Sequence, residues 1–178
     1  MTLFDSPEHS KGGYCVRVFF LPVLVLAATA AHAQERPPTV TSHLVPYVGV
    51  GGVLNSDRNA QFGVEYRWHD VLWGLRPTIG LNVDNDAAIY GYGGLSWDLP
   101  LGRSFYVTPS FMIGAYSHGD SKDLGGWLEF RSGIEVAYAF KDGSRVGIAF
   151  NHVSNADIYD NNPGLETVLI GYHLPIAY

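Results

Sequence analysis

The sequence predicts an all-β protein, an eight-stranded antiparallel transmembrane β-barrel of the outer-membrane type. Three observations support this fold class: an N-terminal export signal, large apolar residues that alternate with small or polar ones, and an unusual composition. Charged residues make up 16% of the chain and aromatic residues 13%, whereas an ordinary soluble domain is about 25% charged. The aromatic content excludes a disordered chain, and a net charge of −6 argues against a nucleic-acid partner.

Residues 1–33 have the organisation of a secretory signal peptide. Basic residues precede an apolar run from Val18 to Ala31, and an A-x-A cleavage pattern ends at Ala33. The run is shorter than the ~20 residues that a transmembrane helix needs. Cleavage leaves a barrel domain of residues 34–178 without cysteine, because Cys15 is the single cysteine of the sequence. Something other than disulfide bonds must therefore hold the exported domain together.

Alternation with a period of two residues marks eight segments of the mature chain. In the clearest segment, Leu124–Phe140, large apolar residues such as Phe130 and Ile134 alternate with charged ones such as Glu129 and Arg131. A transmembrane barrel places the large face in lipid and the polar face in its lumen. In order, the expected strands are His43–Val53, Ala60–His69, Trp73–Asn82, Ile89–Leu99, Phe105–Gly114, Leu124–Phe140, Arg145–Ser154 and Glu166–Tyr178.

Individual strands differ in how clearly they alternate. The first is ambiguous, because Val48–Val53 fits either register. The fourth places Tyr90 and Tyr92 on its polar face, and its glycines let the strand curve. The last strand ends in Tyr178, and a terminal aromatic residue in this alternation resembles the strand that the bacterial barrel-assembly machinery recognises.

The predicted lumen carries charges of both signs. A small barrel fills its interior with side chains, so we expect these charges to form ion pairs, with tyrosines between them, in place of disulfide bonds. The residues concerned are Glu65, Arg67, Arg76, Glu129, Arg131 and Glu135.

The connections between strands predict the orientation of the barrel. Tight joints are expected at His69–Asp70, Pro100–Arg103 and Lys141–Gly143, and longer polar ones at residues 55–59, 84–86, 117–123 and 155–165. In outer-membrane barrels the short turns face the periplasm and the long loops face outward. The strand Arg145–Ser154 therefore ends at the cell surface.

Three polar residues continue the apolar faces of the last two strands. His152 and Ser154 follow Val146, Ile148 and Phe150, and Glu166 precedes Val168 and Ile170. Unpartnered polar groups facing lipid are costly. A serine, a histidine and a carboxylate on one face are typical of a nucleophilic triad, in which Ser154 attacks an ester, His152 accepts its proton and Glu166 orients the imidazole.

The expected intermediate carries a negative oxygen, which needs hydrogen-bond donors. The candidate donors are the side-chain amides of Asn155 and Asn162 and the backbone N–H groups of residues 156 and 157. This chemistry requires no metal and no cofactor.

The residues His152–Ala156, Asn162–Gly164 and Glu166 resemble the active-site hairpin of the lipid A 3-O-deacylases of the PagL type. The resemblance implies an eight-stranded outer-membrane esterase that releases the 3-O-linked hydroxyacyl chain of lipid A. It assigns His152, Ser154 and Glu166 to the triad and Asn162 to the oxyanion hole. The site would face the outer leaflet and its lipopolysaccharide. Asp157 departs from the pattern, since the family has a glycine there whose backbone N–H serves the oxyanion hole.

Other interpretations stay open at this point. A non-enzymatic structural or adhesion barrel also has polar residues where its aromatic girdle ends. A phospholipase or palmitoyltransferase barrel would likewise modify lipids, although residues 34–43 lack the amphipathic helix expected of the latter. A homodimer is compatible with the sequence.

Overall fold

The computed structural model describes residues 41–54 and 58–177. The strands are β1 (Thr41–Gly51), β2 (Asn59–Arg67), β3 (Leu75–Asp84), β4 (Ile89–Trp97), β5 (Leu99–Leu101), β6 (Phe105–Ser117), β7 (Leu128–Ala139), β8 (Arg145–Ser154) and β9 (Leu165–Ala177). No helix in the described part of the chain is long and apolar enough to cross a membrane. The expected signal peptide (residues 1–33) and the terminal Tyr178 lie outside the described residues.

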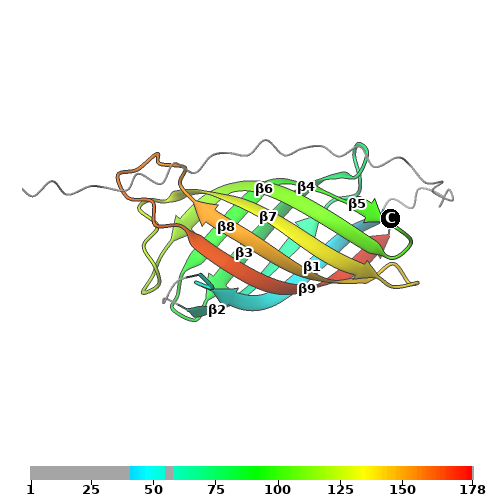
Figure 1. The fold of residues 1–178 in the computed structure, drawn as a ribbon, viewed down its shortest axis with the longest axis horizontal. Coiled ribbons are helices and arrows are strands. Elements are labelled where there is room, and N and C mark those ends of the chain that lie inside the picture. Colours follow the sequence, from blue (N-terminus) through cyan, green and yellow to red (C-terminus); the bar gives the residue numbers. More distant parts are fainter. Residues whose placement is uncertain (1–40, 55–57, 178) are drawn as a thin grey trace, which may run out of the picture. The chain divides into compact units, whose positions relative to one another are not determined.

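These strands form one closed antiparallel barrel. Each strand pairs with its neighbours along the chain, except β4 with β5, and in addition β1 pairs with β9 and β4 pairs with β6. The short β5 continues β4 after an interruption at Asp98, because both pair with β6 in one register. The wall therefore has eight strands, as predicted. Closure leaves no free strand edge (Figure 1).

The alternation of side chains is confirmed in the wall. On β7, Ile134 and Val136 are half exposed on the outer surface, while Glu129, Arg131 and Glu135 are buried in the lumen. The ambiguous first strand points Leu44, Val48 and Val50 outward and His43, Val45 and Tyr47 inward. The outer surface is thus a continuous apolar belt that suits a lipid environment.

A buried ion-pair cluster crosses the middle of the lumen. Glu65 accepts hydrogen bonds from Arg67, at 2.8 Å, and from Arg131. Arg67 also pairs with Glu135 at 2.9 Å, and His173 Nε2 lies 3.0 Å from the same carboxylate. Side chains from three strands, β2, β7 and β9, are thereby tied together without a covalent link, as the sequence led us to expect.

The prediction of lumenal ion pairs is confirmed for Arg76 and is wrong for Glu129. Arg76 pairs with Asp98 at 2.9 Å, and Arg145 joins the same carboxylate at 2.7 Å, so a second cluster lies near the β5 end of the barrel. Glu129 forms no ion pair with any described residue, and its carboxylate oxygens are buried without a hydrogen-bond partner. The ion pair expected for Glu129 is absent from the described part of the chain because strand alternation shows only that a side chain points into the lumen. It does not show which charges lie at the same position along the barrel axis.

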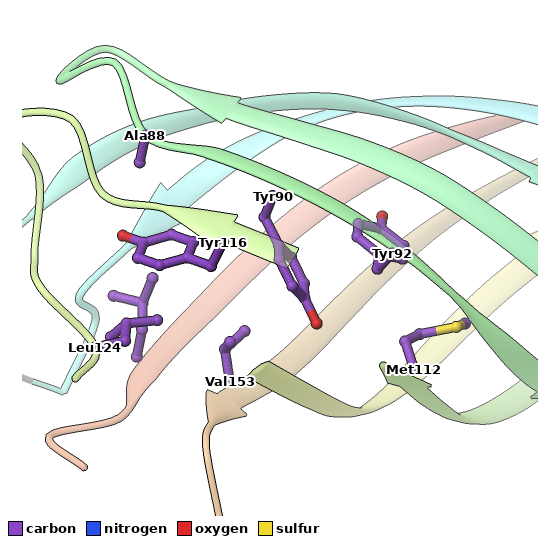
Figure 2. Packing of buried hydrophobic residues seen from close by; sticks show 8 residues of the cluster. Ala88, Tyr90, Tyr92, Met112, Tyr116, Leu124 and Val153 are labelled. Atoms are coloured by element: carbon purple, nitrogen blue, oxygen red, sulfur yellow. The ribbon is translucent and has the colours of Figure 1, made fainter. Parts of the chain in front are cut away.

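A small apolar and aromatic cluster fills the other end of the lumen. It consists of Ala88, Tyr90, Tyr92, Met112, Tyr116, Leu124, Val153 and Leu165. Figure 2 shows Val153 of β8 and Leu124 of the β6–β7 loop among the tyrosines. Val153 lies between His152 and Ser154 in sequence, so the inner face of the predicted catalytic strand is anchored in this cluster.

Several strand boundaries differ from those predicted, and two of these differences change the connections most clearly. The expected tight joint at His69–Asp70 is a longer connection, residues 68–74, since β3 begins only at Leu75. The strand expected from Leu124 begins at Leu128, because Gly125 adopts a φ of 97°. This left-handed conformation breaks an extended strand. The residues from Leu124 onward thereby belong to the loop that meets the candidate site.

Candidate active site

The β8–β9 hairpin places His152 and Glu166 directly opposite each other. His152 Nδ1 lies 3.0 Å from Glu166 Oε1. The histidine side chain is 45% exposed and the glutamate side chain 18% exposed, so the pair is half open on the outer wall. A carboxylate that accepts the Nδ1–H proton fixes the tautomer and leaves Nε2 as a base.

Ser154 lies two residues beyond His152 on the same outward face. A Cβ atom added to Gly164 would lie 3.0 Å from His152 Cε1, so the imidazole lies against the chain that returns from the loop to β9. No hydrogen bond between Ser154 and His152 is formed within the described residues. Catalytic contacts of this kind often tighten only when substrate binds.

Asn155 fastens the loop that follows Ser154. Its backbone N–H donates to Asn162 Oδ1 at 3.1 Å. Its side-chain Nδ2 donates to the carbonyl oxygens of Leu124, at 2.7 Å, and Asn161, at 2.8 Å. Both amide hydrogens are therefore already used. An oxyanion could recruit the Asn155 side chain only by displacing one of these bonds.

Asn162 and Asp157 form a second contact within the same loop. Asn162 Nδ2 donates to Asp157 Oδ1 at 2.9 Å, which leaves the second amide hydrogen of Asn162 for a ligand. Ala156 and Asp157 have φ angles of 54° and 61°. Non-glycine residues in this region are uncommon and concentrate at functional sites. Aspartate tolerates this conformation better than most residues.

Sequence reasoning missed the support that the β6–β7 loop gives to the site. Lys122 Nζ donates to the Gly164 carbonyl oxygen at 2.7 Å, and Leu128 N donates to Tyr159 Oη at 3.3 Å. The Tyr159 ring packs directly on Gly126, where any Cβ atom would overlap it. The adjacent glycines at 125 and 126 were the available signal, because such pairs permit a close approach of two backbones.

Comparisons with known proteins bear on the family and the fold of the chain. Residues 59–175 match the family model described as lipid A 3-O-deacylase (PagL). The chain belongs to this family. It is 24% identical over 172 residues to the lipid A deacylase PagL of Bordetella bronchiseptica, covering 87% of this chain and 93% of that protein. Family membership makes the protein an outer-membrane hydrolase that removes the 3-O-linked acyl chain of lipid A.

Solved structures share the barrel architecture. The crystal structure of the outer membrane enzyme PagL superposes with a TM-score of 0.57 at 22% identity, covering 75% of this chain and 99% of that one. A de novo designed transmembrane β-barrel superposes with a TM-score of 0.56 at 13% identity, covering 81% of this chain and 100% of the design. At these identities the structures support the fold alone, and the family assignment rests on the sequence match.

Proposed function

We propose that this member of the family hydrolyses its ester substrate with a triad of Ser154, His152 and Glu166. The contact between His152 Nδ1 and Glu166 Oε1 on the outer wall carries the proposal. A buried pair of this kind would be an ordinary structural bond, but here the histidine is half exposed in an apolar belt. The neighbouring hydroxyl of Ser154 completes the set that ester hydrolysis needs.

In the proposed mechanism, Ser154 Oγ attacks the ester carbonyl while its proton moves to His152 Nε2. The negative oxygen of the tetrahedral intermediate accepts hydrogen bonds from Asn162 Nδ2 and from the backbone N–H of Asp157. The imidazolium then protonates the leaving sugar oxygen, and the acyl chain stays on Ser154. Water, deprotonated by His152, attacks this acyl-enzyme, and the imidazolium then returns the proton to Ser154 Oγ as the fatty acid leaves. Glu166 stabilises the imidazolium in both halves of the reaction.

The topology supports a site that faces the outer leaflet. The chain ends of the barrel, Thr41 and Ala177, pair with each other at one end of the barrel. The hairpin that carries the site connects β8 and β9 at the opposite end (Figure 1). Both termini of an outer-membrane barrel with an even strand number lie on the periplasmic side, so the hairpin belongs outside. Lipid A can then reach Ser154 by lateral diffusion, without entering the lumen.

Substitution of the nucleophile tests this proposal. Ser154→Ala should insert and fold, as shown by heat-dependent mobility in gel electrophoresis, but should leave the acyl chain on lipid A in mass spectra. Ser104→Ala, in the turn at the other end of the barrel, is the matched control and should keep full activity. Spectra of phospholipids from the same membranes report any competing phospholipase activity. Removal of the hydroxyacyl chain by Ser154→Ala would refute the assignment of the nucleophile.

A further inference from the structure

Ser132 is a polar residue on the outer wall that the triad does not use. It lies on β7 directly opposite His152 and is exposed. The other outward residues of β7 are all apolar or aromatic: Leu128, Phe130, Ile134, Val136 and Tyr138. Among the described residues, no hydrogen bond reaches its hydroxyl group. A hydroxyl without a protein partner in an apolar belt is available to a ligand.

Ser132, His152 and Glu166 form one row across three neighbouring strands. Residues directly opposite in such a row have Cβ atoms about 4.5–5.5 Å apart. The imidazole turns its Nδ1 atom away from Ser132, to Glu166, and its Cε1 atom lies against Gly164. Because Gly164 immediately precedes β9, both of these contacts lie on the β9 side of β8, away from Ser132 on β7. Ser132 therefore lies beside the reacting centre without belonging to the triad.

The position of Ser132 relative to Ser154 suits the substrate. The two residues are diagonal neighbours on adjacent antiparallel strands, because Phe130 is the direct partner of Ser154. Diagonal neighbours are about 7–8 Å apart. A hydrogen bond between hydroxyl groups spans about 2.8 Å. The remaining distance fits a hydroxyl group that is one or two carbon–carbon bonds from the ester carbonyl.

The wall beyond Ser132 is apolar on both strands. Ile134 pairs with Phe150, and Val136 pairs with Ile148. All four side chains are 40–59% exposed. An acyl chain whose carbonyl lies at Ser154 can pass Ser132 and then continue along these side chains into the hydrocarbon layer. Ser132 is the polar point on this path.

We propose that Ser132 Oγ binds the hydroxyl group of the hydroxyacyl chain and makes the enzyme select hydroxylated over plain acyl esters. The inference rests on the proposed function of Ser154, since it takes the ester carbonyl to lie there. Ser132 acts on specificity: its hydrogen bond holds the chain so that the carbonyl stays near the nucleophile. A substrate without the hydroxyl group cannot form this bond.

The test compares two lipid A substrates that carry, at the 3-O position, either a 3-hydroxyacyl chain or an unsubstituted chain of equal length. Wild-type enzyme should favour the hydroxylated substrate in kcat/KM. Ser132→Ala should lower this preference about tenfold, as expected for one lost hydrogen bond, and Ser132→Thr should restore it. Val136→Ala, further along the same face, is the control and should change both substrates equally. Ser132→Ala removes a polar group from the lipid-facing wall, so folding should not suffer.

The outcomes separate this inference from the proposed function. An unchanged preference in Ser132→Ala overturns the specificity role, and so does an equal loss on both substrates. If Ser132→Ala abolishes hydrolysis of both substrates while Ser154→Ala stays active, Ser132 is the nucleophile and both proposals fall. If Ser154→Ala is inactive and Ser132→Ala keeps the wild-type preference, the triad stands and only the inference fails.

Discussion

Replacing Gly164 by alanine should move His152, the proposed catalytic base. The added Cβ atom would lie 3.0 Å from His152 Cε1, which is closer than carbon atoms normally approach, so the ring must shift by a few tenths of an ångström or more. The shift acts on the His152 Nδ1–Glu166 Oε1 contact of 3.0 Å and on the approach of Nε2 to Ser154. Since a misplacement of about 1 Å costs about 100-fold in rate, we expect kcat to fall between about tenfold and 100-fold.

A second effect of Gly164→Ala must be separated from the first. Gly164 has a φ of 64°, and alanine in this region costs about 1 kcal/mol of folding free energy. Gly102 is the matched control, because its φ is 70° and no atom lies within 4 Å of an added Cβ. Gly102→Ala should lose the same stability and keep its kcat.

The assay is the release of hydroxyacyl chains from lipid A in detergent micelles, at saturating substrate. Urea unfolding of the same samples, followed by tryptophan fluorescence, measures the stability of each variant. Wild-type kcat in Gly164→Ala would refute the reasoning. An equal loss of kcat in both glycine variants would refute it as well, since the loss would then follow backbone strain and not the position of His152.

Two further predictions concern charge. Glu65→Gln leaves Arg67 and Arg131 with an incomplete set of buried partners. The free energy of unfolding in urea should therefore fall by about 3–5 kcal/mol. The kcat should stay unchanged, because the proposed site lies on the outer wall. An unfolding midpoint equal to that of wild type would contradict the structural role of the cluster. Asp157→Asn keeps a carbonyl acceptor for Asn162 but removes a negative charge near the developing oxyanion. Because about 1 kcal/mol of charge repulsion in water is relieved, we expect kcat to rise up to about fivefold. This gain should shrink at higher salt, which screens the repulsion. A kcat below that of wild type at low salt would show that the carboxylate itself is needed.

The wall of the barrel and the face of each site residue could be predicted from the sequence. Alternation on β8 places His152 and Ser154 outward and Val153 inward, because a strand has only two faces. The partner of each charge could not be predicted this way. Arg145 of β8 reaches Asp98, which follows β4, across the lumen, and only the stagger of a closed barrel brings these two to the same height.

The loops were the part of the site that sequence patterns did not reach. Asn155 was a candidate oxyanion donor by its position, yet its amide hydrogens bond the carbonyl oxygens of Leu124 and Asn161. That arrangement depends on where a loop some thirty residues earlier returns to the barrel. Loop contacts of this kind follow no period, so neither strand alternation nor turn composition predicts them.

The bonds between the β6–β7 loop and the β8–β9 loop have a consequence for building such enzymes. The proposed chemistry lies on β7, β8 and β9 and on the two loops at the end of the barrel that carries the β8–β9 hairpin, whereas β1 to β6 close the cylinder. A β8–β9 hairpin transplanted onto another barrel of the same size would carry the His152–Glu166 pair. It would lack the hydrogen bond from Lys122 to Gly164 and the packing of the Tyr159 ring on Gly126. The smallest transferable unit is therefore three strands with both loops, grafted in a register that keeps His152 on the lipid side.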